Sequence, residues 1–184
     1  NTSTNNTFSG WLQDGTNSGK LNLAKTGTGT LTLNGTNNTY SGTTTVTGGT
    51  LKVNSTMTNT AVSVSSTGVL GGSGSLGSTT VGGGGKLSPG NSPGTLTING
   101  DLTWTNGGSY DWEIFKLAEN GGVAGTDWDL INATGNLDLS GLSGAGAFSI
   151  NLFSLSGTNT AGPLAGFTNT SDYEWKILDA AGIT

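Results

Sequence analysis

The chain has 184 residues, a length that suits one domain, and its 6 basic and 11 acidic residues give a net charge of −5. Charged residues make up only 9% of the sequence, and such sparse basic side chains provide no footprint for nucleic acid or an anionic membrane. Neither Cys nor His is present, which excludes disulfides, thiolate chemistry, His-containing triads and the usual zinc sites. We therefore expect no cofactor.

Short runs of alternating apolar and polar residues, separated by Gly, fill the N-terminal half. Thr30–Leu33, Thr43–Val46 and Thr50–Val53 each alternate with period two, which predicts half-buried strands. Asn34-Gly35 and Gly48-Gly49 stand between them and are predicted to form sharp turns. Strands this short must stack on neighbours, so we expect a solenoid with about 20 residues per turn.

The pattern continues more loosely to residue 104. Two Pro-Gly steps within residues 88–94 predict tight turns. Asn99-Gly100 joins two further strands, Thr95–Ile98 and Asp101–Trp104, and we interpret this pair as a corner between two faces, in preference to a hairpin loop. No apolar run has the 3.6-residue period of an amphipathic helix, so the sequence predicts essentially no helix.

After residue 105 the predicted strands become longer, more aromatic and more acidic. We treat residues 1–184 as a single β-helical domain with regular Gly- and Thr-rich turns in 1–104 and less regular strands in 105–184. The strands expected in this second part are Ser109–Phe115, Asp127–Ile131, Asn136–Leu139, Phe148–Leu155 and Asp172–Leu178.

Several of these segments resemble a known repeat family. Residues 6–10 (Asn-Thr-Phe-Ser-Gly), 19–33, 38–46 and 49–53 (Gly-Thr-Leu-Lys-Val) resemble the autotransporter-associated β-strand repeat, also called the passenger-associated transport repeat. Residues 87–98 are similar to a Leu-Ser-Pro-Gly-Asn-Ser-Pro-Gly-Thr-Leu-Thr-Ile segment common in such passengers.

The resemblance implies a right-handed, single-stranded parallel β-helix that is displayed on or secreted from bacteria. It leaves the export route open between a type V barrel and a C-terminal sorting signal. It also implies that the chain is an excerpt of a longer protein.

Two pairs of acidic residues could carry chemistry. Asp111/Glu113 and Asp127/Asp129 have the i, i+2 spacing that places two carboxylates about 6.6–6.8 Å apart on one face of a strand. That separation fits inverting glycoside hydrolysis, and the four oxygen-rich side chains are also weak calcium candidates. The simpler interpretation is a solvated strand face with Trp112 or Trp128 turned inward, and we assign no catalytic residues.

Aromatic residues are concentrated in the second part of the chain. They could form a platform for stacking sugars, although aromatic residues in such strands more often fill the core or cap it. The candidate binding residues are Trp104, Tyr110, Trp112, Trp128 and Trp175.

The sequence therefore supports three functional hypotheses. The first is a non-enzymatic stalk or spacer of a bacterial surface or secreted protein, whose open ends could pair copies end to end into fibres. The second is an adhesin that binds a host or matrix glycan or protein through the aromatic residues of 105–184. The third is a polysaccharide-cleaving β-helix enzyme.

Overall fold

The computed structural model describes residues 3–36, 38–118, 121–144, 147–157, 160–168 and 170–184, and within these ranges it contains strands and no α-helix. The strands are β1 (Asn6–Phe8), β2 (Leu23–Lys25), β3 (Thr30–Leu33), β4 (Thr44–Val53), β5 (Thr56–Met57), β6 (Val62–Gly72), β7 (Ser75–Leu76), β8 (Thr79–Val81), β9 (Lys86–Pro89), β10 (Thr95–Ile98), β11 (Leu102–Trp104), β12 (Gly108–Ile114), β13 (Leu130–Ala133), β14 (Asn136–Asp138), β15 (Phe148–Gly157), β16 (Thr160–Ala161), β17 (Leu178–Asp179) and β18 (Gly182–Ile183).

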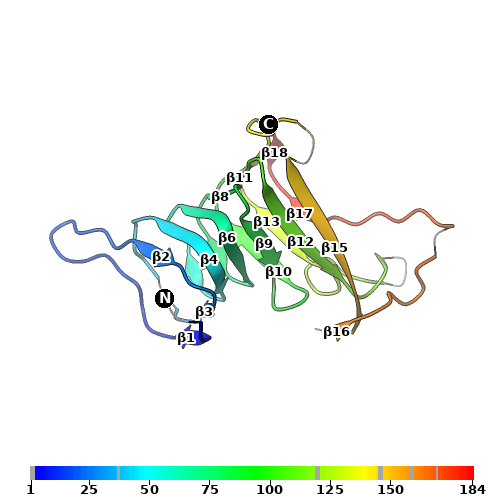
Figure 1. Ribbon diagram of the computed structural model, residues 1–184, viewed down its shortest axis with the longest axis horizontal. Coiled ribbons are helices and arrows are strands. Elements are labelled where there is room, and N and C mark those ends of the chain that lie inside the picture. Colours follow the sequence, from blue (N-terminus) through cyan, green and yellow to red (C-terminus); the bar gives the residue numbers. More distant parts are fainter. Residues whose placement is uncertain (1–2, 37, 119–120, 145–146, 158–159, 169) are drawn as a thin grey trace.

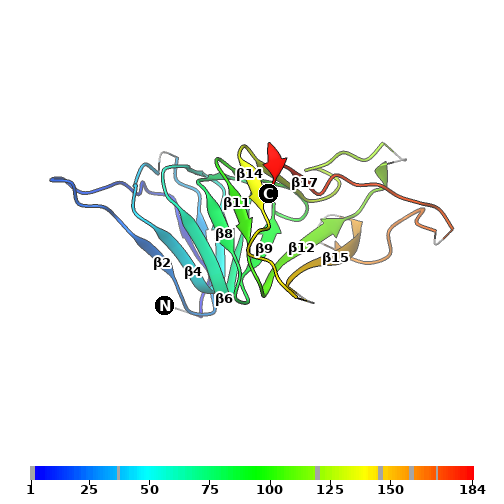
Figure 2. The ribbon, with the colours of Figure 1, turned by 90° about the horizontal axis from the view of Figure 1, so that it is seen from above.

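The strands form two sheets in which neighbouring strands run parallel, except that β16 is antiparallel to β15. In the larger sheet one row of pairs runs from β3 through β4, β6, β9 and β12 to β15, and a second runs from β2 through β4, β6, β8, β11 and β14 to β18. The smaller sheet has the order β17-β13-β10-β7-β5. Successive strands lie side by side along the long axis of the molecule, and the segment between β1 and β2 extends beyond one end (Figures 1 and 2).

The length of chain between paired residues is short at first and then increases. Thr44 pairs with Val62, and Val62 pairs in turn with Thr79, so the first turns are short and nearly equal. Leu102 pairs with Leu137 and Asn136 pairs with Gly182, and these later turns are about twice as long or longer. The expected turn length of about 20 residues is therefore wrong for the second part of the chain, which was expected to be less regular, because extra residues there leave the sheets as long connections.

Inward-facing apolar side chains of successive strands stack into continuous rows. In β4, β6, β9 and β12, paired positions hold Leu51, Leu70, Leu87 and Tyr110, and all four side chains are fully buried. The next position in this row, on β15, is Ile150, and 49% of its surface is exposed. A similar row in the smaller sheet consists of Met57, Leu76, Ile98 and Ala133.

A buried lysine occupies an inward position near the first end of the stack. Lys25 of β2 pairs with Val46, and its Nζ donates to the carbonyl oxygens of Thr26, Gly27 and Gly48 at 3.0, 3.0 and 2.8 Å. Burial lowers the pKa of this ammonium group, because the charged form loses hydration. The three carbonyl oxygens replace part of that hydration, which is how a charged side chain is tolerated in the core.

Two turn predictions had different outcomes. Gly48-Gly49 lies inside β4, so the predicted turn between two strands is wrong. Gly49 does adopt a positive φ of 59°, and the register between β4 and β6 shifts after Val46, so these glycines form a bulge that keeps the strand continuous. Asn99-Gly100 is a corner as predicted, because β10 belongs to the smaller sheet and β11 to the larger one.

The strand expected over Asp172–Leu178 is also wrong for most of its length. Only Leu178 belongs to a strand, β17, and the residues before it cross the end of the stack without a continuous ladder. Individual groups in this segment instead accept side-chain hydrogen bonds, such as the carbonyl of Lys176 from the Trp128 indole at 3.1 Å. The alternation of polar and apolar residues in this segment is not enough to predict a strand, because a strand also needs a neighbouring strand with which its backbone can pair.

Replacing Leu70 by Ala should lower the free energy of unfolding by about 2–5 kcal/mol, because the change leaves a cavity in a closely packed row. The control is Val69→Ala on the opposite face of the same strand, for which we expect a loss of about 1 kcal/mol or less. Urea denaturation followed by circular dichroism measures both. Equal losses in the two variants would contradict the assignment of Leu70 to the core row.

Candidate functional site

The first acidic pair lies on the outer face of β12, as the sequence predicts. Asp111 and Glu113 are both half-buried, and the intervening Trp112 is directed into the core. Asp111 is already engaged: its Oδ2 lies 2.7 Å from Lys86 Nζ, and its Oδ1 accepts a hydrogen bond of 2.7 Å from Asn151 Nδ2. The side chain of Glu113 makes no hydrogen bond or ion pair with any described residue.

The second acidic pair is not on a strand, so that part of the prediction is wrong. Asp127 and Asp129 lie in the turn and extended segment before β13, and both are buried. Asp127 Oδ2 accepts a hydrogen bond of 2.8 Å from the Val123 N–H. These carboxylates close a turn and brace neighbouring backbone, because buried acceptors must find donors.

Asp129 joins three parts of the chain. Its Oδ1 accepts from the Gly94 N–H at 2.8 Å, and its Oδ2 accepts from the Glu113 N–H at 3.1 Å. Its backbone carbonyl accepts from the Trp112 indole N–H at 2.8 Å. Burial raises the pKa of Asp129 to about 7; the two backbone hydrogen bonds act in the opposite direction, and the nearby charge of Glu113 adds to the increase.

The calcium candidates are not brought together. Within the part of the chain that the structure describes, no three acidic side chains are close enough to hold a metal ion. Asp111 is paired with Lys86, whereas Asp127 and Asp129 accept backbone N–H groups. Metal binding by these four residues therefore has no geometric support in the described ranges.

Most of the candidate aromatic residues lie in the core. Trp104, Tyr110, Trp112 and Trp128 are buried. Trp104 stacks on Phe148 of β15 with centroids 4.1 Å apart, and burial raises the pKa of the Tyr110 phenol. Their packing matches the structural interpretation of strand aromatics, and sugar binding through these four rings stays a prediction.

Trp175 differs from the other four because it lines a pocket. The pocket has a volume of about 410 Å³ and is lined by Ile114, Leu152, Ser154, Pro163, Leu164, Phe167 and Trp175. Tyr173 stacks between Phe167 and Trp175, with centroid distances of 5.0 and 5.5 Å. The Trp175 indole N–H is buried and has no hydrogen-bond partner among the described residues. This pocket is mainly apolar.

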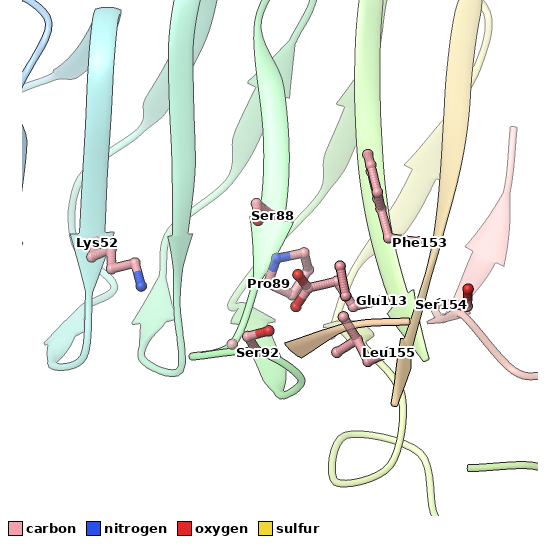
Figure 3. Close-up of a pocket in the computed structure, with 10 residues that line it drawn as sticks. Lys52, Ser88, Pro89, Ser92, Glu113, Phe153, Ser154 and Leu155 are labelled. Carbon is pink, nitrogen blue, oxygen red and sulfur yellow. The ribbon is translucent and has the colours of Figure 1, made fainter. Parts of the chain in front are cut away.

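A second pocket on the outer face of the larger sheet was not predicted from the sequence. It has a volume of about 350 Å³ and contains Lys52, Glu113 and Phe153 among its lining residues (Figure 3). One signal was available: Leu152-Phe153 breaks the alternation of Phe148–Leu155, which requires one of the two adjacent apolar side chains to face outward. The structure leaves 46% of Phe153 exposed.

Comparison with known proteins is consistent with this architecture. The stacked parallel strands include a passenger-associated transport repeat: residues 23–53, which contain β2, β3 and β4, match the passenger-associated-transport-repeat family. The chain is also 38% identical over 120 residues, or 65% of its length, to an extracellular serine protease of Serratia marcescens. That match covers 11% of the relative, so the chain spans about a tenth of the protein it resembles.

These matches confirm the resemblance to passenger-associated repeats and indicate part of an autotransporter passenger region in a secreted protein. Among the described residues there is no helix with the length and apolar character needed to span a membrane.

Stability should decrease with increasing pH because of Asp129. Its folded-state pKa of about 7 lies above the ordinary value of 3.8, so the folded state binds this proton more tightly than the unfolded chain does. The resulting stabilisation is complete below pH 4, is lost as pH increases from 4 to 7, and amounts to about 4 kcal/mol at most. Urea denaturation between pH 4 and 8 measures this slope.

Asp129→Asn should show a flatter pH dependence than the wild type, even though the amide replaces an acceptor and lowers stability at low pH, where the wild-type carboxyl group is protonated. The control is Asp179→Asn at the exposed pair with Lys176, which should keep the wild-type slope. An unchanged slope in Asp129→Asn would show that another group causes the pH dependence.

Proposed function

We propose that this chain is a rigid β-helical spacer in the passenger region of a bacterial cell-surface or secreted protein. In this proposal the stacked strands form a right-handed, single-stranded parallel β-helix. The supporting observation is continuous parallel register along a row of outer positions in six successive strands. The row consists of Ala24, Thr45, Ser63, Thr80, Thr103 and Asp138.

Repeated short-range contacts would make such a stack stiff. Each turn contacts mainly its neighbours, so stability is approximately a sum of turn and interface contributions. Each fully buried apolar side chain in the core rows contributes about 1.5–3 kcal/mol. Polar side chains also connect neighbouring turns on the outside: Asn54 Nδ2 donates to Asn34 Oδ1 at 3.1 Å, and Asn91 Nδ2 donates to Asn54 Oδ1 at 3.3 Å.

The protease named in the comparison does not by itself make this chain catalytic. A Ser-His-Asp triad needs a histidine as the base, and this sequence contains none. We therefore extend the proposal to a non-enzymatic role for this chain. End-to-end assembly of copies into fibres stays a prediction.

Rigidity can be tested with paired spin labels, because the native chain has no Cys. Ala24 and Asp138 are five strand spacings apart and Ala24 and Thr103 are four, so Cys pairs at these positions should give distances of about 24 and 19 Å. Pulsed electron spin resonance should show narrow distributions that differ by about one strand spacing. Broad, overlapping distributions would contradict a rigid spacer.

A second candidate function, glycan binding, is supported by the pocket at Trp175. A sugar ring could stack on Phe167, 53% of which is exposed. An array of neutral and acidic oligosaccharides tests this candidate. Binding should be lost in Phe167→Ala, which removes the exposed ring, whereas a blank array with the wild type would remove the candidate.

A further inference from the structure

The pocket at Lys52, which we call the outer groove, crosses several strands of the larger sheet (Figure 3). Lys52 lies on β4, Ser88 and Pro89 on β9, Glu113 on β12, and Phe153 on β15. Its complete lining is Lys52, Ser88, Pro89, Gly90, Ser92, Glu113, Phe153, Ser154, Leu155 and Ala161.

Strand register explains why the groove is open at its centre. Lys52 pairs with Gly71 of β6, and Gly71 pairs with Ser88 of β9. A glycine and a serine follow the long lysine side chain along this row, so no large side chain stands between Lys52 and β12 in it. The groove therefore has small side chains at its centre and larger ones at both ends.

Its two charged side chains are opposite in sign and unpaired. Neither Lys52 nor Glu113 makes a side-chain hydrogen bond or ion pair with any residue that the structure describes. On the same outer face, Lys86 and Asp111 are paired at 2.7 Å. Three strand spacings, about 14 Å of backbone, separate β4 from β12, which is too far for Lys52 and Glu113 to neutralise each other directly.

The end of the groove at Glu113 is held in place by the buried carboxylate of Asp129. Asp129 binds the backbone N–H of Glu113 and that of Gly94, and so ties β12 to the turn that contains Ser92. Ser92 has a φ of 78°, a conformation that a non-glycine residue adopts only when its surroundings hold it there. The groove wall is therefore fixed before any ligand arrives.

We propose that the outer groove binds an extended peptide segment with a basic side chain at one end and an acidic side chain four residues away, a spacing that places both side chains on one face of the segment. Glu113 and Phe153 occupy opposite positions on paired strands, and a carboxylate beside an exposed aromatic ring suits a cationic side chain. Lys52 receives the carboxylate at the other end. Four residues of extended chain span about 13 Å, which is close to the roughly 14 Å of backbone that separates β4 from β12.

Neutral glycans fit this groove less well than a peptide. A neutral sugar would leave both charges without a partner, whereas a peptide of this pattern neutralises each of them. Between the two ends, the hydroxyl groups of Ser88 and Ser92 can accept hydrogen bonds from peptide N–H groups or donate to peptide C=O groups. This inference does not depend on the spacer role.

The test is fluorescence polarisation with a labelled Lys-Ala-Ala-Ala-Asp peptide blocked at both ends. Lys52→Met and Glu113→Gln should each weaken binding about five- to tenfold, because each removes one charge-assisted contact at a half-exposed site. Lys86→Met on the same face but outside the groove should bind like the wild type. A Lys-Asp-Ala-Ala-Ala peptide of the same composition should bind more weakly, because its two charges lie too close together and on opposite faces of the extended chain.

A charge reversal separates recognition from a structural effect. Lys52→Glu should bind Lys-Ala-Ala-Ala-Lys in preference to Lys-Ala-Ala-Ala-Asp, the opposite of the wild-type order. The proposal is overturned if the wild type shows no saturable binding, if the groove variants bind like the wild type, or if only the oligosaccharides of the array compete at this site. Unchanged spin-label distances in these variants would show that the spacer proposal stands whichever result is obtained.

Discussion

Parallel pairing in register is the constraint on which the rest of this molecule depends. Because β4, β6, β9 and β12 pair in register, each inward side chain must pack against the inward side chain at the paired position of the preceding strand. The leucines at 51, 70 and 87 satisfy this requirement with identical side chains, and Tyr110 satisfies it with a larger one. A single misplaced residue would reverse the faces of a whole strand, so alternation is strongly maintained.

The same constraint explains which parts of the fold the sequence predicts. Strand β3 was predicted with its observed bounds, because four alternating residues next to Asn-Gly leave few alternatives. Gly48-Gly49 was misassigned because positive φ is common to turns and bulges, and the choice depends on the neighbouring strand. The longer turns after β11 were also missed, since connections carry no periodic signal.

The candidate sites were harder to predict because register, and not sequence proximity, assembles them. Lys52 and Glu113 are far apart in the chain, and only the pairing of four strands places them on one groove. The i, i+2 spacing of Asp127 and Asp129 is visible in the sequence, but it does not reveal that both are buried or that Asp129 accepts hydrogen bonds from the N–H groups of Gly94 and Glu113. Four of the five candidate aromatic rings are buried, as expected for aromatic residues that fill the core, because large apolar side chains stabilise the core by burying much surface.

Connection length also determines where this architecture can carry a site. Between β4 and β9 the chain returns quickly to the larger sheet, so the connections are too short to add side chains above the faces. Beyond β12 the longer connections add Phe167 and Trp175, and the short strand β16 adds Ala161, and these residues contribute walls to the two pockets. The two proposed roles would therefore draw on one fold: the strands fix the spacing of the outer positions and carry Lys52, Glu113 and Phe153, and the connections add the walls around them.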